Sequence, residues 1–337
     1  MTDSEARRCI RDLRAGVVTP ETARAVTAGT STLIASIRAE LASFARGDRG
    51  SHLIFLRGDW GFGKSHVRAL CEYEIGRIGA PYICGWVDGR DRSLAHLNRC
   101  VPGWLNSLQI GNLCGLPAAV TYDHFDPAAV LEWCRKSGTA FADGVRLALM
   151  GSPRGWLLAT GEWYSWPDYG YQHPKALAIV HAAADFIQAM TGSGIVLLLD
   201  EVENITREWD IRGRKKCYEV LMDLAKNANM LLGLFVTDRF FHQVTEDQQR
   251  GQREGWDDGQ LGSFFRLVKA ANVFDAPALD RNLARALVRK IAELYSIAYG
   301  RGAIDEDQVL STWYATPTRS PRLLIRQTIH LLDLDSA

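Results

Sequence analysis

The chain has 337 residues and a mass of 37.5 kDa, and its 47% hydrophobic and 23% charged residues are typical of a globular protein. This composition excludes disordered, collagen-like and coiled-coil proteins. The 39 basic and 39 acidic side chains give a formal net charge of zero, so no overall positive field attracts nucleic acid or an anionic membrane. Any contact with DNA must therefore come from a local basic patch.

Three features of the sequence bear on the compartment and on cofactors. The apolar run at 195–199 is far shorter than the roughly 20 residues that cross a bilayer, so we expect no membrane partner. The first residues, MTDSEARRCIRDLR, are charged and lack the apolar segment of a signal peptide, which predicts a cytoplasmic protein. The seven cysteines include no C-x-x-C pair, which predicts reduced, mostly buried thiols rather than disulfides or a zinc site.

The first part of the chain leads from predicted helices into a strand, a loop and a helix. Helical spacing of apolar residues predicts helices at 5–15 and 31–45. A short apolar run at 52–57, bounded by glycines, predicts a buried parallel strand. A helix at 67–78 and a second strand at 82–87 follow, so the order is strand, glycine-rich loop, helix, strand.

Residues 91–175 show no long hydrophobic period, because Gly and Pro interrupt them repeatedly. We interpret this segment as a helical insertion whose tryptophans belong to a core. The alternative is a recognition surface that makes partner-specific contacts. Five of the ten tryptophans lie here, at Trp104, Trp133, Trp156, Trp163 and Trp166.

The pattern after residue 175 returns to an alternation of helices and strands. A helix at 175–190, a strand at 194–200, a helix at 217–228 and a strand at 230–236 predict a doubly wound α/β fold with a parallel sheet. The polar, glycine-containing segment 246–260 is predicted to be a mobile surface loop.

The last part of the chain is predicted to be helical throughout. Its expected helices lie at 281–298, 305–314 and 321–332. The sequence therefore predicts three parts: an N-terminal helical extension at 1–48, an α/β core at 49–278 that contains the insertion, and a small helical domain at 279–337.

The strongest motif lies between the first predicted strand and the helix after it. It runs Gly58, Asp59, Trp60, Gly61, Phe62, Gly63, Lys64 and Ser65, and it matches G-x-x-x-x-G-K-[ST] in full. In such a P-loop, backbone N–H groups and the helix N-terminus bind the phosphates of a nucleotide. Lys64 is predicted to contact the β- and γ-phosphates of ATP, and the Ser65 hydroxyl to ligate Mg²⁺. The alternative is a glycine-rich turn that matches by chance.

Four further positions fit a nucleotide site. The strand at 194–200 ends in Asp200 and Glu201, and we predict that Asp200 holds Mg²⁺ while Glu201 activates the attacking water. Thr237, at the end of the next strand, is a candidate sensor of the γ-phosphate. Arg322, at the start of the last helix, is a candidate contact to the nucleotide. The structural alternatives are an acidic strand-end turn, a satisfied hydroxyl and a surface ion pair.

Together these motifs resemble an AAA+ ATPase, with a P-loop, an Asp-Glu pair after a buried strand, a threonine sensor and a helical lid that begins with Pro-Arg. The chain is more closely similar to the ATP-binding proteins of BREX-type bacterial phage-defence systems, the BrxD-like family. The similarity rests on RRCIRDLRAGVVTP at 7–20, FLRGDWGFGKSH at 55–66, LLLDEVENI at 197–205 with Arg214 and Tyr218 after it, and SPRLLIRQTIHLLD at 320–333. One departure is Asp238 after Thr237, where relatives tend to have proline.

The resemblance implies a three-layer α/β AAA+ core with a C-terminal helical lid, and ATP and Mg²⁺ as cofactors. AAA+ sites form between protomers, so it also implies a homo-oligomer in which an arginine finger reaches the neighbouring site. We assign the finger to Arg266, just before the last expected core strand. Arg239 lies too close to the sensor strand to leave its own protomer.

A basic cluster beyond Asp200 is the candidate DNA contact. It comprises Arg212, Arg214, Lys215 and Lys216, with Arg207 ahead of them. In several AAA+ machines the corresponding region faces a central channel, so the resemblance suggests a loop that contacts phosphates. The alternative is an ordinary solvated face.

The sequence therefore predicts a Mg²⁺-dependent ATPase that couples ATP to assembly or remodelling in a DNA-directed phage-defence complex. Its expected partners are other copies of the chain, helicase or methyltransferase components, and double-stranded DNA. The alternatives are an AAA+ transposition-type DNA adaptor and a non-hydrolysing nucleotide-dependent scaffold. ATP-dependent filaments on duplex DNA would favour the adaptor, and an ATPase assay separates the enzyme from the scaffold.

Overall fold

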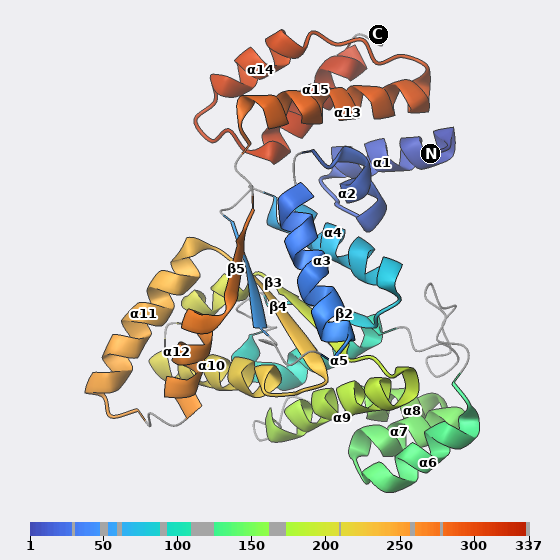
Figure 1. Ribbon diagram of the computed structural model, residues 1–337, viewed down its shortest axis with the longest axis vertical. Helices are drawn as coiled ribbons and strands as arrows, with labels where there is room; N and C mark the ends of the chain where they lie inside the picture. The colour runs from blue at the N-terminus through green and yellow to red at the C-terminus, as the bar shows by residue number, and fades with distance from the viewer. Residues whose placement is uncertain are drawn as a thin grey trace. The chain divides into compact units, whose positions relative to one another are not determined.

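A computed structural model describes residues 1–28, 31–47, 53–58, 63–87, 93–108, 125–161, 173–208, 210–256, 260–276 and 279–334. The protein is a largely helical α/β protein with one five-stranded sheet in the order β2-β3-β4-β1-β5 (Figure 1). The strands are β1 Leu53–Arg57, β2 Tyr82–Trp86, β3 Ile195–Asp200, β4 Met230–Val236 and β5 Asn272–Asp275. Strands β2, β3 and β4 pair in parallel, as predicted.

The helices occupy most of the remaining described residues. In the first half of the chain they are α1 Asp3–Ala15, α2 Pro20–Val26, α3 Ser31–Ala45, α4 Lys64–Ile78, the 3₁₀ helix η1 Leu94–His96, α5 Leu97–Ser107, α6 Pro127–Ser137, α7 Ala140–Leu149 and α8 Pro153–Ala159. In the second half they are α9 His173–Thr191, the 3₁₀ helix η4 Val202–Arg207, α10 Ile211–Ala225, α11 Asp238–Arg253, α12 Gln260–Ala270, α13 Arg281–Tyr299, α14 Glu306–Tyr314 and α15 Pro321–Leu334.

Two predicted boundaries are wrong by six residues or more. The segment 246–260 was expected to be a surface loop, but α11 continues through Arg253, anchored by the buried Val244 and Asp247. Helix α10 begins at Ile211 rather than at 217, because the side chain of Asp210 caps it by accepting a hydrogen bond from the Arg212 N–H. Most of the predicted basic loop is therefore helix.

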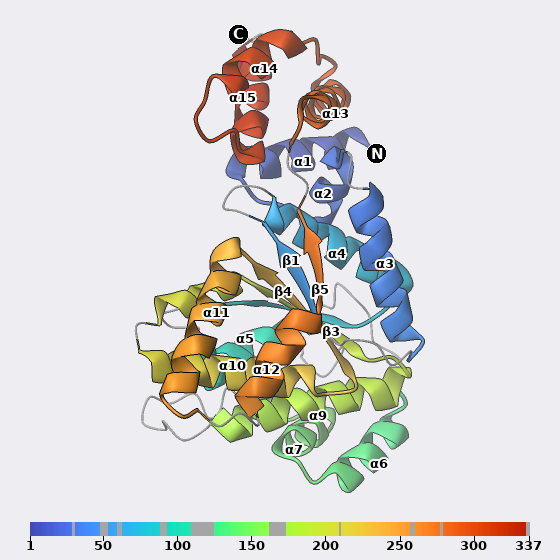
Figure 2. The ribbon, with the colours of Figure 1, turned by 60° about the vertical axis from the view of Figure 1, so that its left-hand side comes forward.

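The chain divides into two compact units, and the residues of β1 and of β5 are shared between them. Figure 2 shows β1 and β5 as neighbours in the sheet. One unit contains residues 1–41, 56–78 and 274–337, and the other contains 42–55 and 79–273. We call them the P-loop-helix unit and the sheet unit.

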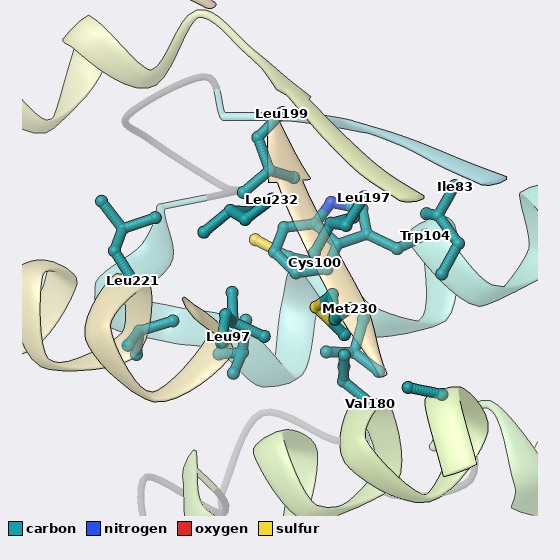
Figure 3. Close-up of a cluster of buried hydrophobic side chains, with 14 of the residues drawn as sticks. Ile83, Leu97, Cys100, Trp104, Val180, Leu197, Leu199, Leu221, Met230 and Leu232 are labelled. Carbon is teal, nitrogen blue, oxygen red and sulfur yellow. The ribbon is translucent and has the colours of Figure 1, made fainter. Parts of the chain in front are cut away.

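The core of the sheet unit lies between β3 and β4 and three helices. Figure 3 shows Leu197 and Leu199 of β3 and Leu232 of β4 facing side chains from α5, α9 and α10. Val196 and Leu198 alternate to the opposite face of β3 and are equally buried. Both faces of β3 are therefore covered, which is compatible with a three-layer α/β architecture.

The described part of the 91–175 segment is helical, as expected, and its apolar residues join the core of the sheet unit. Trp104 is buried, and Trp133 packs edge-on against Phe186 with ring centroids 5.0 Å apart. Trp156 is also buried, and its indole N–H donates to Asn106 Oδ1 at 3.0 Å. These three tryptophans are core aromatics, as predicted. Trp163 and Trp166 lie outside the described residues.

In the P-loop-helix unit, the two ends of the chain share one hydrophobic cluster. Ile10 and Leu13 of α1 pack with Ile291 of α13 and Ile329 of α15. Helix α2 packs on α4, where Ala23 lies in a cluster with Ala69 and Leu70. From the sequence we predicted the N-terminal extension and the C-terminal helices as separate parts. Their packing against each other was not predicted.

The cysteines and the apolar character of the helices were both addressed by the sequence analysis. The six cysteines in the described ranges form no disulfide, and five of them are buried, as predicted. Burial raises the pKa of the Cys71 and Cys217 thiols to about 12. No helix within the described ranges is both long and apolar enough to cross a membrane.

Candidate functional site

The P-loop motif lies where the sequence placed it, between β1 and α4. Helix α4 begins at Lys64, and Gly63 before it has a φ of +97°, a conformation that a residue with a Cβ rarely adopts. The Gly63 carbonyl accepts the N–H of Val67 at 2.9 Å, which closes the first helical turn. Helix N–H groups in this turn have no intrahelical partner, so they can bind an anion. Asp59, Trp60, Gly61 and Phe62 lie outside the described residues.

The side chain of Lys64 turns back along its own loop. Its Nζ donates to the Gly58 carbonyl at 3.0 Å. Arg57, the last residue of β1, accepts at its carbonyl the N–H of Ala276 at 2.7 Å, and its guanidinium forms a bidentate ion pair with Asp275. Strand β5 therefore holds the start of the loop.

His66, the residue after Ser65, contacts the N-terminal helices, which the sequence did not predict. Its Nε2 lies 3.0 Å from the Thr27 hydroxyl at the end of α2. The Thr27 hydroxyl donates to Ala23 O at 2.6 Å. Because this hydroxyl has no second hydrogen to donate, it accepts a hydrogen bond from the Nε2–H group of His66. In the neutral imidazole the proton is therefore on Nε2. Burial lowers the pKa of the imidazole to about 4, so His66 is neutral near pH 7.

In the sheet unit, the predicted acidic pair lies at the carboxyl edge of β3. Asp200 is 2% exposed, and its Oδ1 accepts the backbone N–H of Glu201 at 2.9 Å. Because β3 and β4 are parallel neighbours, with Leu199 opposite Leu234, Thr237 lies at the same edge of the sheet. The structure thus brings Asp200, Glu201 and Thr237 together at one end of adjacent strands.

Glu201 has a strained backbone. Its φ of +58° and ψ of +32° are in the left-handed region, which costs a residue with a side chain about 1–2 kcal/mol. Its Oε2 accepts from Asn204 Nδ2 at 2.9 Å, and the same amide donates to the Val87 carbonyl at 2.7 Å. Asn204 is 1% exposed, so it ties the Glu201 carboxylate to the end of β2. The sequence analysis missed Asn204, although its spacing of three residues from Glu201 is that of one helical turn.

Thr237 carries a buried hydroxyl without a partner. The residue is 3% exposed, and its Oγ1 forms no hydrogen bond with any described residue. Thr237 precedes α11, but its side chain does not cap that helix. The structural alternative of a satisfied strand-end hydroxyl therefore does not hold within the described part of the chain.

The two candidate arginines are both exposed. Arg266 lies on α12, where its guanidinium donates to Ser263 Oγ at 2.9 Å. Arg322 is the second residue of α15 and forms no ion pair with the described residues, which argues against the surface ion pair considered for it.

The structure corrects the predicted DNA contact at Arg214. This side chain is buried, and its Nε and Nη2 donate to the carboxylate of Asp247 on α11 at 2.8 and 3.0 Å. Tyr218 donates to the same carboxylate at 2.8 Å. Arg214 therefore joins α10 to α11 and cannot bind a phosphate without breaking a buried ion pair.

The remaining cations of the cluster lie on α10 rather than in a loop. Arg212 and Lys216 are exposed, whereas Lys215 lies 3.9 Å from Glu219 and 5.9 Å from the centre of the Trp256 ring. These positions leave a smaller basic surface than the sequence predicted.

Each unit, taken by itself, carries groups of a kind that can bind part of a Mg²⁺–nucleotide. The first turn of α4 offers N–H groups and the Lys64 ammonium for phosphates. The carboxyl edge of β3 and β4 offers a carboxylate for a hydrated cation and an unpartnered hydroxyl for a phosphate oxygen. No protein-family model matches the chain, and no curated protein is significantly similar to it.

Proposed function

We propose that the protein binds ATP with Mg²⁺ and hydrolyses it. The observation that carries the proposal is the complete P-loop motif at the junction of β1 and α4, with Lys64 and Ser65 in the first helical turn. The acidic pair at the end of β3 and the unpartnered hydroxyl of Thr237 support it. The finer assignment to the AAA+ class rests on the sequence resemblance and is part of the proposal.

Each residue has a chemical role in the proposed reaction. Lys64 binds the β- and γ-phosphate oxygens, and Ser65 and Asp200 hold the cation. Mg²⁺, when bound, neutralises the negative charge of the phosphates. Glu201 accepts a proton from the attacking water through Oε1, because Asn204 already occupies Oε2. Thr237 donates its hydroxyl to a γ-phosphate oxygen.

Two substitutions test the proposal by separating binding from turnover. Lys64→Ala removes a charge-assisted hydrogen bond, and we expect ATP affinity to fall by about 10- to 100-fold. Glu201→Gln retains ATP affinity and abolishes turnover, because the amide cannot accept the proton. Lys136→Ala and Glu219→Gln are matched controls outside the motifs and should change neither quantity. Equal turnover in the wild type and Glu201→Gln would refute the assignment of Glu201.

The biological setting remains a proposal from the sequence resemblance. We propose that the ATPase acts as a homo-oligomer in a BREX-like, DNA-directed defence complex, with Arg266 and Arg322 completing the nucleotide site. A methyltransferase, helicase or phosphatase-like gene next to its own gene would support this setting. A neighbouring transposase gene would favour the DNA adaptor instead.

A further inference from the structure

Helix α1 carries a second basic surface, separate from that of α10. A groove of about 790 Å³ runs along this helix, and four arginines line it together with Tyr299 from the end of α13. We call it the arginine groove. Its arginines are Arg7, Arg8, Arg11 and Arg14. All of these residues belong to the P-loop-helix unit, in which Figure 1 shows α1 beside α13.

The helical period gathers the arginines on the outer side of α1. Arg7, Arg11 and Arg14 are spaced by four and three residues, so they lie on one face of the helix, and Arg8 flanks them. The opposite face carries Ala6, Cys9, Ile10 and Leu13, all buried against α13 and its neighbours. Because packing fixes the buried face, the arginine face is held toward solvent.

Two of the arginines, Arg7 and Arg14, are held in place by contacts with α13 and α15. Arg7 Nε donates to the Ala298 carbonyl at 2.8 Å, and Arg14 forms an ion pair with Asp333. Both guanidinium carbons lie 5.7 Å from the centre of the Tyr299 ring. A guanidinium carries five N–H donors, so each keeps donors for a ligand.

The other two arginines have almost no partner of their own. Arg8 forms no ion pair with the described residues, and Arg11 has only Asp12, at 3.9 Å. The groove also contains Asp3 and Glu5, but the Glu5 carboxylate already accepts the Thr2 N–H at 2.7 Å. With Asp12 beside Arg11 and Asp333 beside Arg14, the acids around the groove equal its four arginines in number. An anion would therefore bind through the exposed N–H donors of Arg8 and Arg11 rather than through an excess of positive charge.

We propose that the arginine groove binds the phosphate backbone of duplex DNA. Arg7 and Arg14 are about 10 Å apart along the helix axis, given a rise of 1.5 Å per residue. Phosphates on one strand recur every 3.4 Å along the duplex axis, so this face can contact about three of them. Arginine is also the side chain best suited to paired N–H contacts with phosphate.

The groove suits a duplex better than a single strand. Proteins that bind single strands stack the bases on free aromatic rings. Tyr299 is the aromatic residue that lines the groove, and the guanidinium groups of Arg7 and Arg14 already lie over its ring. The inference rests on the DNA-directed part of the proposed function. It assigns the DNA contact to the arginine groove instead of to the basic residues of α10.

The test is binding of a fluorescent 30-base-pair duplex by the full chain without nucleotide, measured by anisotropy from 50 to 200 mM salt. Arg8 and Arg11 are exposed and outside the hydrophobic cluster, so Arg8→Ala with Arg11→Ala should fold normally. We expect weaker binding at every salt concentration and a salt slope smaller by about two. Arg8→Lys with Arg11→Lys should restore most of the affinity. Arg135→Ala with Lys136→Ala, two exposed cations on α6, is the matched control and should bind as the wild type does.

Two results would overturn the inference. One is no duplex binding by the wild type at 50 mM salt, and the other is equal binding by the wild type and the variant with alanine at positions 8 and 11. A wild type that hydrolyses ATP but does not bind duplex DNA would refute the arginine groove as a DNA site and leave the ATPase proposal standing. Loss of hydrolysis in Glu201→Gln with normal DNA binding would support both.

Discussion

The unpartnered hydroxyl of Thr237 makes a prediction in which stability and activity change in opposite directions. Thr237→Val replaces the hydroxyl with a methyl group of similar size. The hydroxyl is buried and forms no hydrogen bond with the described residues, and the residue's extended backbone, with φ of −101°, suits valine. A buried, unsatisfied polar group costs about 1–3 kcal/mol, so the substitution should raise the free energy of unfolding by that amount.

The assay is urea unfolding of the nucleotide-free protein together with steady-state ATPase turnover. With a slope of about 3 kcal/mol per molar, the urea midpoint should rise by roughly 0.3–1 M. Turnover should fall, because the valine cannot donate to a γ-phosphate oxygen. Thr328→Val is the matched control, since the buried Thr328 hydroxyl donates to the Leu324 carbonyl at 2.8 Å and its loss should not stabilise the protein.

A Thr237→Val protein that is less stable than the wild type would refute this reasoning, because the hydroxyl would then have a partner to lose. Greater stability with unchanged turnover would refute the sensor assignment alone. The two readouts therefore test the local structure and the proposed chemistry separately.

Three other substitutions are expected to have measurable effects. Gly144→Ala should destabilise the protein by about 1–3 kcal/mol or more in urea unfolding, because its Cβ would lie 2.3 Å from the backbone nitrogen of Ala159 on α8; an unchanged midpoint would contradict the packing. Burial lowers the pKa of His66 from 6.5 to about 4, so the free energy of unfolding should fall by up to about 1.4 kcal/mol per pH unit as the pH drops between these values, and His66→Asn should remove that dependence. Arg266→Ala should keep ATP affinity and lose about 10³-fold in turnover, and mixing it with Lys64→Ala should restore part of the activity if the arginine acts on a neighbouring subunit.

Much of the α/β layout could be predicted from the sequence because its signals are local. The runs LIFLR, IVLLLD and MLLGLFV are too short and too apolar for surface helices, and each is a strand in the structure. The P-loop motif is likewise a contiguous pattern, so its place between a strand and a helix could be predicted, although α4 begins at Lys64, three residues before the predicted start at 67.

Contacts between segments far apart in the chain could not be predicted. Asp247 was read as part of a polar loop, because nothing in its neighbourhood shows that Arg214 and Tyr218 are its partners. The same holds for the link between His66 and Thr27. A single sequence shows which side chains can form such pairs but not which ones the fold brings together.

Two features at the carboxyl edge of β3 and β4 lower the free energy of unfolding of the protein when no ligand is bound. Glu201 has a left-handed backbone that glycine would adopt without strain, and Thr237 buries a hydroxyl that valine would not. Either cost alone could be incidental to packing. Both occur at the ends of adjacent parallel strands, next to a buried aspartate, where ligands of open α/β sheets bind. Under the proposed function, a phosphate oxygen would accept the Thr237 hydrogen bond and remove the cost of the unsatisfied hydroxyl. The strain at Glu201 would remain, because it lies in the backbone, and it would be the cost of keeping this carboxylate beside Asn204 for the attacking water.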